Sequence, residues 1–154
     1  MSLTIGQAAP TFSLPNDASS TTTLAQYAGR TLVLYFYPKD DTSGCTQEAK
    51  DFSELKAQFS ALNTDIVGVS PDGVTSHCKF KTKYDLNLDL VSDEAKTMLE
   101  AYGVWVEKSM YGKKYMGVER TTVLINGQGI ILNMWSKVKV PNHAQEVLNF
   151  IKNL

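Results

Sequence analysis

The chain has 154 residues, 43% hydrophobic and 20% charged, which is ordinary for a globular domain large enough to bury its own core. Its 15 basic and 16 acidic residues give a net charge of −1 without long blocks of either sign, which argues against a nucleic-acid or anionic-membrane surface. No apolar run approaches the ~20 residues of a membrane span, and the N-terminus has no signal-peptide pattern. We therefore expect one domain over residues 1–154, in the cytoplasm.

The first half of the chain alternates between expected strands and helices. The run TLVLYFY is β-branched and aromatic over its whole length, which is typical of a strand buried on both faces. The turn SPDG is expected to supply helix-capping side chains. In chain order, the expected elements are a strand at 11–14, a short helical segment at 24–28, a strand at 31–37, an amphipathic helix at 45–62, a strand at 65–69 and a helix at 74–84.

The second half predicts a short helix at 93–102, two strands at 120–125 and 129–134 joined by an Asn-Gly-Gln turn, and a closing helix at 143–153. Between the expected helix at 93–102 and the strand at 120–125 lie several aromatic and Lys residues. We interpret them as a solvated loop with aromatic packing, or as the rim of a site or a contact for a reductant. They are Trp105, Lys108, Tyr111, Lys113, Lys114 and Tyr115. The order of elements indicates an α/β fold with a mixed central sheet flanked by helices.

Cys45 is one of only two cysteines, and it stands where the buried strand leads into the amphipathic helix. Open α/β sheets place their sites at the carboxyl ends of such strands. The first turn of a helix offers free backbone N–H groups and the positive end of the helix dipole. With a nearby cation, such a setting lowers the pKa of a thiol from about 8.5 to between about 3.5 and about 7.5. These features predict a reactive thiolate.

The alternative is that Cys45 is a small core residue, because free cysteine is among the most buried residue types. On a helical wheel it lies about 50° from the centre of the face formed by Phe52, Leu55, Phe59 and Leu62, which places it at the edge of the core. Position alone leaves the two interpretations evenly balanced.

The spacing Pro38-x-x-x-Thr42-x-x-Cys45 resembles the signature of the peroxiredoxins, thiol peroxidases with a thioredoxin-like fold. The wider context is similar to the Q-type, or bacterioferritin-comigratory, branch. The matching segments cover nearly the whole chain in the order of that branch: FSLP, LVLYFYPKDDTSGCTQEA, VGVSPD, LVSDEAKTMLEAYGVW, EKSMYGKKYMG and ERTTVLINGQG. Ser43 stands where most members of the branch have proline, from which we expect a slightly looser loop and unchanged chemistry.

This resemblance implies that Cys45 is the peroxidatic cysteine, that Pro38 and Thr42 line its pocket, and that Arg120 approaches the thiolate from a distant strand. An arginine suits that role because its planar, always-charged fork can contact both the thiolate and the peroxide oxygens. Without the resemblance, Arg120 would be interpreted as an ordinary surface or strand-edge arginine. The fold it implies is thioredoxin-like, with an N-terminal β extension.

The second cysteine, Cys78, is the internal candidate for the resolving thiol. Many Q-type members carry that cysteine five residues after the peroxidatic one, where this chain has Lys50, and others carry it in the later helix. On a helical wheel Cys78 points about 130° away from the face of His77, Phe80 and Tyr84, so we expect it to be partly exposed. A surface cysteine without a role is the alternative.

The order Cys45, His77, Cys78, His143 contains no C-x-x-C or H-x-x-x-H pairing, which argues against zinc, and the absence of C-x-x-C argues against a thioredoxin-type reductase. The resemblance implies a cofactor-free peroxidase for hydrogen peroxide and alkyl hydroperoxides. Its Cys45 sulfenic acid would form a disulfide with Cys78, which thioredoxin or glutaredoxin would reduce. A monomer is expected, with a dimer as the other possibility. The alternatives are a one-cysteine peroxidase resolved by an external thiol, and a peroxide sensor or holdase.

Overall fold

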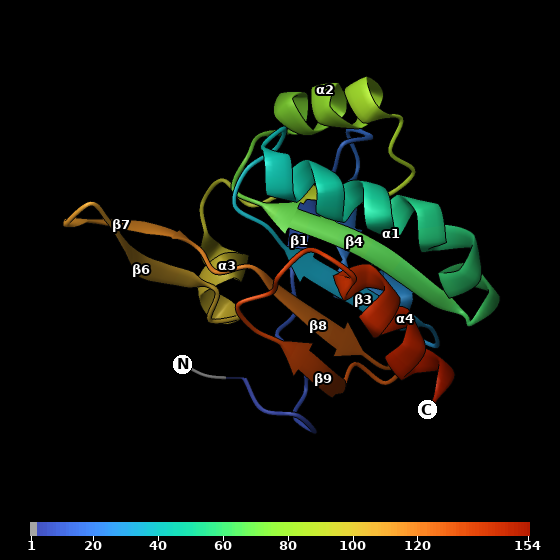
Figure 1. The fold of residues 1–154 in the computed structure, drawn as a ribbon. Helices are drawn as coiled ribbons and strands as arrows, with labels where there is room; N and C mark the ends of the chain where they lie inside the picture. The colour runs from blue at the N-terminus through green and yellow to red at the C-terminus, as the bar shows by residue number, and fades with distance from the viewer. Residues whose placement is uncertain (1–2) are drawn as a thin grey trace.

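The computed structural model describes residues 3–154, and its centre is a five-stranded mixed sheet with the strand order β5-β4-β3-β8-β9 (Figure 1). β3 pairs in parallel with β4 and antiparallel with β8, and β4 pairs in parallel with β5. The sheet strands are β3 (Thr31–Phe36), β4 (Thr64–Ser70), β5 (Asp89–Ser92), β8 (Thr121–Ile125) and β9 (Ile131–Trp135). The expected mixed sheet is confirmed. The edge strand β5 was missed because its four residues are too few for a clear periodicity.

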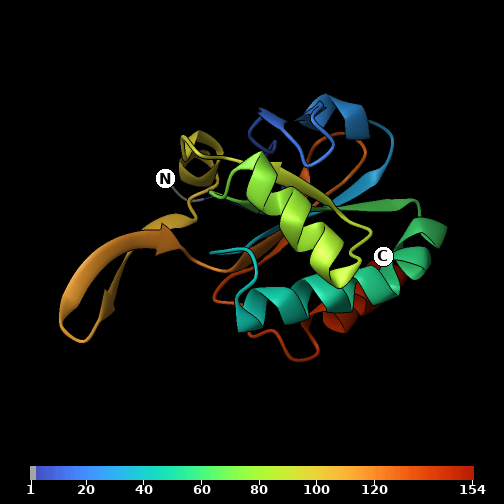
Figure 2. The ribbon, with the colours of Figure 1, turned by 90° about the horizontal axis from the view of Figure 1, so that it is seen from above.

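Helices cover both faces of this sheet, and Figure 2 shows the layers from above. α1 (Ser43–Ala61), α2 (Val74–Tyr84) and α4 (His143–Lys152) lie on one face. α3 (Thr97–Ala101) and the N-terminal segment, with β1 (Ser13–Pro15), β2 (Thr21–Thr23) and the 3-10 helix η1 (Leu24–Tyr27), lie on the other. β1 and β2 form the expected N-terminal β extension.

The alternation of side chains along β3 divides the core between the two faces. Val33, Tyr35 and Tyr37 point into the layer beneath α1 and α4, whereas Leu32 and Leu34 point toward the N-terminal segment and α3. The side chains of all five are 0% exposed. From Leu32 to Tyr37 every position is therefore aliphatic or aromatic, because this part of the strand has no solvent-facing side.

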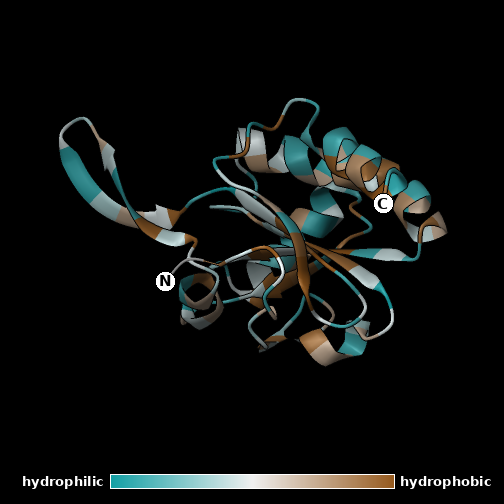
Figure 3. Cartoon of the chain, turned by 90° about the horizontal axis from the view of Figure 1, so that it is seen from below, coloured by the Kyte–Doolittle hydropathy of each residue, from teal (hydrophilic) through white to brown (hydrophobic). Residues whose placement is uncertain are grey.

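The segment interpreted as a solvated loop is instead a β-hairpin. β6 (Trp105–Met110) pairs antiparallel with β7 (Lys113–Val118), and the arm projects from the body of the molecule (Figures 1 and 2). In the hydropathy view the arm is mixed in character, whereas the strands of the central sheet are mostly hydrophobic (Figure 3). Only the base of the arm, at Trp105 and Val118, packs against the core, and its outer part is mostly exposed, which is why its sequence lacks the period of a core strand.

Two helical expectations were also wrong in detail. The third helix covers only Thr97–Ala101, because Lys96 has a φ of 63° and so cannot continue a right-handed helix. α2 begins after Gly73, and no side chain of the described residues caps its N-terminus. The carboxylate of Asp72, expected to cap it, instead accepts a hydrogen bond from the backbone N–H of Asp40 at 2.8 Å.

Candidate active site

Cys45 lies in the first turn of α1, directly after the loop that leaves the buried strand β3. Its side chain is only 1% exposed and belongs to the core under α1, so the expectation that it would lie at the edge of the core was wrong. The helical wheel placed the buried face around Leu55 and Leu62, but Leu62 is 36% exposed. The true face is centred on Cys45, Ala49, Phe52 and Phe59, because α4 packs over the start of the helix as well.

Arg120 reaches Cys45 from the segment immediately before β8, which is the strand next to β3. Its Nη2 donates a hydrogen bond to the Sγ of Cys45 at 3.3 Å, and its Nη1 donates to the Oε1 of Glu48 at 2.7 Å. Burial lowers the pKa of Arg120, but the charge of Glu48 and the sulfur of Cys45 outweigh this effect and raise it. A permanent cation therefore lies against the sulfur, and it stabilises a thiolate there.

Glu48 is the site residue that the sequence analysis missed. It lies one turn after Cys45 on α1 and is 1% exposed. Burial raises the pKa of Glu48 to about 7, although the charge of Arg120 acts in the opposite direction. Its Oε2 has no hydrogen-bond partner among residues 3–154. An acidic residue between Cys45 and Ala49 on the core-facing side of the helix was the signal that could have revealed it, because a buried carboxylate requires a cation.

Gly44 makes room for the guanidinium. A Cβ atom at this position would lie 3.3 Å from the Nη2 of Arg120 and 4.0 Å from the Cγ2 of Val140. A methyl group there would press directly on the donor that contacts Cys45. The glycine before the cysteine is therefore explained by the close approach of a distant side chain, not by an unusual backbone angle.

Thr42 and Pro38 flank the cysteine in the loop before α1. Thr42 is the N-cap residue of α1, and its Oγ1 donates a hydrogen bond to the carbonyl of Lys39 at 2.8 Å. The hydroxyl proton is thus occupied, and the oxygen presents its lone pairs as acceptors. Thr42 is exposed and Pro38 is half-buried, so both border the open side of the site.

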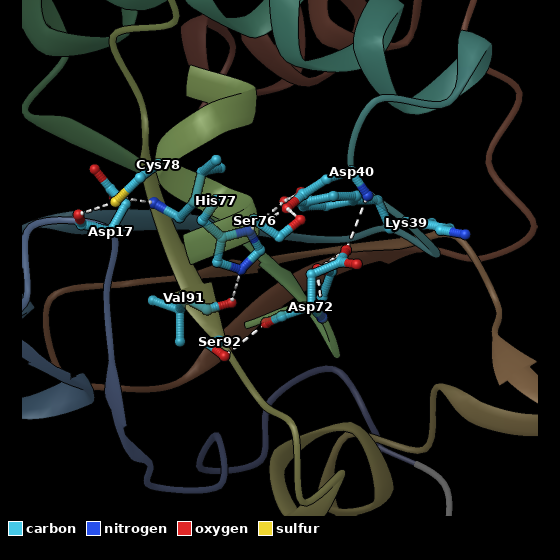
Figure 4. Close-up of polar contacts among 12 residues, drawn as sticks. Asp17, Lys39, Asp40, Asp72, Ser76, His77, Cys78, Val91 and Ser92 are labelled. Carbon is cyan, nitrogen blue, oxygen red and sulfur yellow. Dashed lines mark hydrogen bonds and ion pairs between the residues drawn. The ribbon is translucent and has the colours of Figure 1, made fainter. Parts of the chain in front are cut away.

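Cys78 lies in α2 and is partly exposed, as expected. Its Sγ donates a hydrogen bond to the backbone carbonyl of Asp17 at 2.9 Å (Figure 4). Both cysteines are free thiols. Lys50, at the position where many relatives keep a second cysteine, places its ammonium 5.1 Å from the ring centre of Tyr84 on α2.

Within residues 3–154, no group of three or more His, Cys, Asp and Glu side chains is arranged to hold a metal ion. Nor does the described part of the chain contain a helix with the length and apolar character needed to cross a membrane.

The sheet, the helix that begins with a cysteine after the central strand and the arginine against its sulfur define a thiol-dependent redox protein on a thioredoxin-like fold. Residues 5–134 match the AhpC/TSA family. The chain is 47% identical to a putative peroxiredoxin Bcp of Coxiella burnetii, over 96% of this chain and 98% of the relative. It is 45% identical to peroxiredoxin Bcp of Bacillus subtilis, over 100% of this chain and 98% of the relative.

Solved structures agree with these relatives. Peroxiredoxin Q of Xanthomonas campestris superposes with a TM-score of 0.89 at 43% identity, covering 92% of this chain and 90% of that one. A PrxQ variant of Xylella fastidiosa superposes with a TM-score of 0.95 at 39% identity, covering 99% and 98%. The chain therefore belongs to the AhpC/TSA family, in its Bcp or Q-type peroxiredoxin branch, and is a thiol peroxidase: it consumes peroxides with electrons from a thiol reductant.

Proposed function

We propose that this peroxidase reduces hydrogen peroxide and organic hydroperoxides by a two-cysteine cycle within one chain, with Cys45 as the peroxidatic and Cys78 as the resolving residue. The observation that carries the proposal is the contact between Arg120 and the sulfur of Cys45 at the first turn of α1. The Xanthomonas campestris bacterioferritin comigratory protein, 42% identical to this chain, has been described for its alkyl peroxide reduction activity, which supports organic hydroperoxides as substrates.

In the first step, the Cys45 thiolate attacks the terminal oxygen of the peroxide. An S–O bond forms as the O–O bond breaks, and the departing hydroxide or alkoxide takes up a proton and leaves as water or alcohol. Arg120 and the backbone N–H groups of the first turn stabilise the charge that develops on the oxygens. The lone pairs of Thr42 Oγ1 accept the O–H of the peroxide, and Pro38 shields the pocket.

In the second step, the thiol of Cys78 condenses with the Cys45 sulfenic acid. The S–S bond forms, the S–O bond breaks, and the hydroxyl leaves with the thiol proton as water. A disulfide requires Cα atoms closer than about 7 Å. Because Cys45 is buried in α1 and the thiol of Cys78 is bonded to Asp17, we propose that local unwinding of α1 or α2 accompanies this step.

Thioredoxin or a glutaredoxin then reduces the disulfide. The cycle uses residues of one chain and one domain, so we propose a monomer as the working form, in a reducing compartment such as the cytoplasm.

The test is peptide mass spectrometry after one equivalent of peroxide, together with thioredoxin-dependent turnover of a Cys78→Ser variant. We expect a Cys45–Cys78 linkage in the parent protein and loss of thioredoxin-dependent turnover in the variant. Turnover at the parental rate in the variant would mean that an external thiol resolves Cys45. A single stoichiometric oxidation of the parent protein without turnover would indicate a sensor in place of an enzyme.

A further inference from the structure

A polar cluster with a buried centre joins the loop before α1 to the start of α2. It consists of Tyr37, Asp40, Asp72, Ser76 and His77, and is called the Asp40 cluster below. The carboxylate of Asp40 accepts a hydrogen bond from Tyr37 Oη at 2.6 Å. It also accepts one from Ser76 Oγ at 2.8 Å, and its Oδ2 lies 2.7 Å from the Nδ1 of His77 (Figure 4). His77 is 0% exposed and Asp40 is 7% exposed, so the central pair is buried, whereas Asp72 and Ser76 are half-buried at its border.

The hydrogen bonds determine the charge of His77. Its Nε2 lies 2.9 Å from the carbonyl oxygen of Val91, which can only accept, so Nε2 carries a proton. Asp40 already accepts from two hydroxyl groups and is a carboxylate, so the Nδ1 that faces it carries a proton as well. Burial lowers the pKa of His77, but the hydrogen bond to Asp40 and the charges of Asp40 and Asp72 outweigh that effect and raise it. His77 and Asp40 thus form a buried ion pair.

This pair connects the two segments that carry the thiols. Asp40 lies in the loop that leads to Cys45, whereas His77 is the immediate neighbour of Cys78 in α2. On the other side of Cys78, its sulfur is bonded to the carbonyl of Asp17, whose carboxylate binds Lys81 of the same helix at 2.8 Å. The first turns of α2 are therefore held in place from two directions.

We propose that Asp40 and His77 are positioning residues whose ion pair latches α2 against the loop before Cys45, and that this latch must open before Cys78 can reach the Cys45 sulfenic acid. The role in resolution rests on the function proposed above. The pair stabilises α2 in its position against the loop before Cys45. It therefore sets which fraction of the Cys45 sulfenic acid forms the disulfide and which fraction reacts with a second peroxide. That second reaction transfers one further oxygen and yields sulfinic acid, with water or alcohol released.

The latch depends on the charge of His77, and therefore on pH. The groups that face His77 are Tyr37 and Asp40 from the segment after β3, Asp72 from the turn before α2, and the carbonyl of Val91 on β5. As pH rises through the raised pKa of His77, the imidazolium loses its proton and the ion pair is lost. We therefore expect α2 to open more readily at higher pH.

The primary experiment measures amide hydrogen exchange of α2 in the reduced protein, expressed as protection factors over a pH series. For His77→Gln and Asp40→Asn we expect protection to fall at least about tenfold at pH 6, because one charge of a buried pair is removed. In Asp40→Asn the fall of protection with rising pH should be shallower than in the parent protein, because no ion pair is left to lose and burial lowers the pKa of His77. Ser76→Ala keeps the pair and should give a smaller loss. If a variant does not fold, the pH series of the parent protein still tests the latch.

Leu99→Ala in α3, on the opposite face of the sheet, is the control for general destabilisation. Equal loss of α2 protection in this control, or a pH dependence in Asp40→Asn or His77→Gln as steep as that of the parent protein, would overturn the latch. A parent protein whose α2 protection does not fall with rising pH would overturn it as well. The second readout is the ratio of Cys45–Cys78 disulfide to Cys45 sulfinic acid after excess peroxide, which we expect to rise in the latch variants. If the parent protein forms no such disulfide, the proposed two-cysteine function is wrong. The protection factors of α2 in the reduced protein still decide whether the latch exists.

Discussion

Arg120 Nη2 contacts Cys45 Sγ at 3.3 Å, although the two residues come from elements that are far apart in the sequence. The antiparallel pairing of β8 with β3 creates this contact, because it brings the start of β8 to the end of β3. In that register Thr121 lies opposite Phe36, so the residue just before β8 arrives beside the loop that leads to Cys45. The first prediction follows from this geometry.

Replacing Arg120 by lysine should lower kcat/KM for peroxide about 10²- to 10³-fold, the loss typical of removing a donor that stabilises developing negative charge. Lysine keeps the charge but cannot contact Cys45 and Glu48 with a planar fork. Arg30→Lys is the matched control, because Arg30 also pairs with a carboxylate, that of Asp65, but at the surface. Comparable losses in both variants would contradict the role of the fork.

Replacing Glu48 by glutamine should change the pH dependence of stability. Burial raises the pKa of Glu48 from 4.5 to about 7, so the folded state holds a proton that the unfolded state has released. Between these values stability therefore falls as pH rises, and above about 7 this contribution stays constant. Urea unfolding from pH 4.5 to 8 should show a steeper decline in the parent protein than in Glu48→Gln, in which the contribution of His77 remains. The exposed Glu54→Gln serves as control.

Replacing Gly44 by alanine should lower the peroxidase rate several-fold with little change in Tm. The new methyl group would lie 3.3 Å from Arg120 Nη2 and would displace the donor from Cys45 by a few tenths of an ångström. Gly117→Ala places its methyl group equally close to a side-chain carbon, that of Lys108, on the projecting hairpin. Its peroxidase rate should remain unchanged, and a fall equal to that of Gly44→Ala would argue against a specific effect on Arg120.

Replacing Gly68 by alanine should cost about 1–3 kcal/mol of the free energy of unfolding, because the core there is already full. The added Cβ would lie 2.7 Å from both Cζ and Oη of Tyr35 and 3.0 Å from Leu90 Cδ2. The Tyr35 hydroxyl is buried and has no hydrogen-bond partner within the described residues, so Tyr35→Phe should be neutral or stabilising. In the double variant the cost should be smaller, since one of the clashing atoms is gone. A double-mutant cycle by chemical denaturation measures this, and strict additivity would contradict it.

The local order of elements was largely predictable from the sequence. The uninterrupted apolar run of β3 indicated a strand buried on both faces, and the turn after Ile125 indicated the hairpin of β8 and β9. The arm of β6 and β7 was not predictable in this way, because its strands pair with each other and contact the core only at Trp105 and Val118. A hydrophobic period reflects burial along a whole face, and most of this hairpin is exposed or half-buried.

The same distinction applies to the candidate site, of which one part was predictable from the sequence and the other was not. The sequence by itself determined that Cys45 begins a helix behind a buried strand, because strand and helix periods are local properties of the chain. Only the tertiary structure decided that Cys45 is buried, that Glu48 holds Arg120 and that Asp40 pairs with His77. These depend on which strands are neighbours and on how much solvent the helices exclude. Neither a contact across the sheet nor the charge of a buried group can be read from one segment alone.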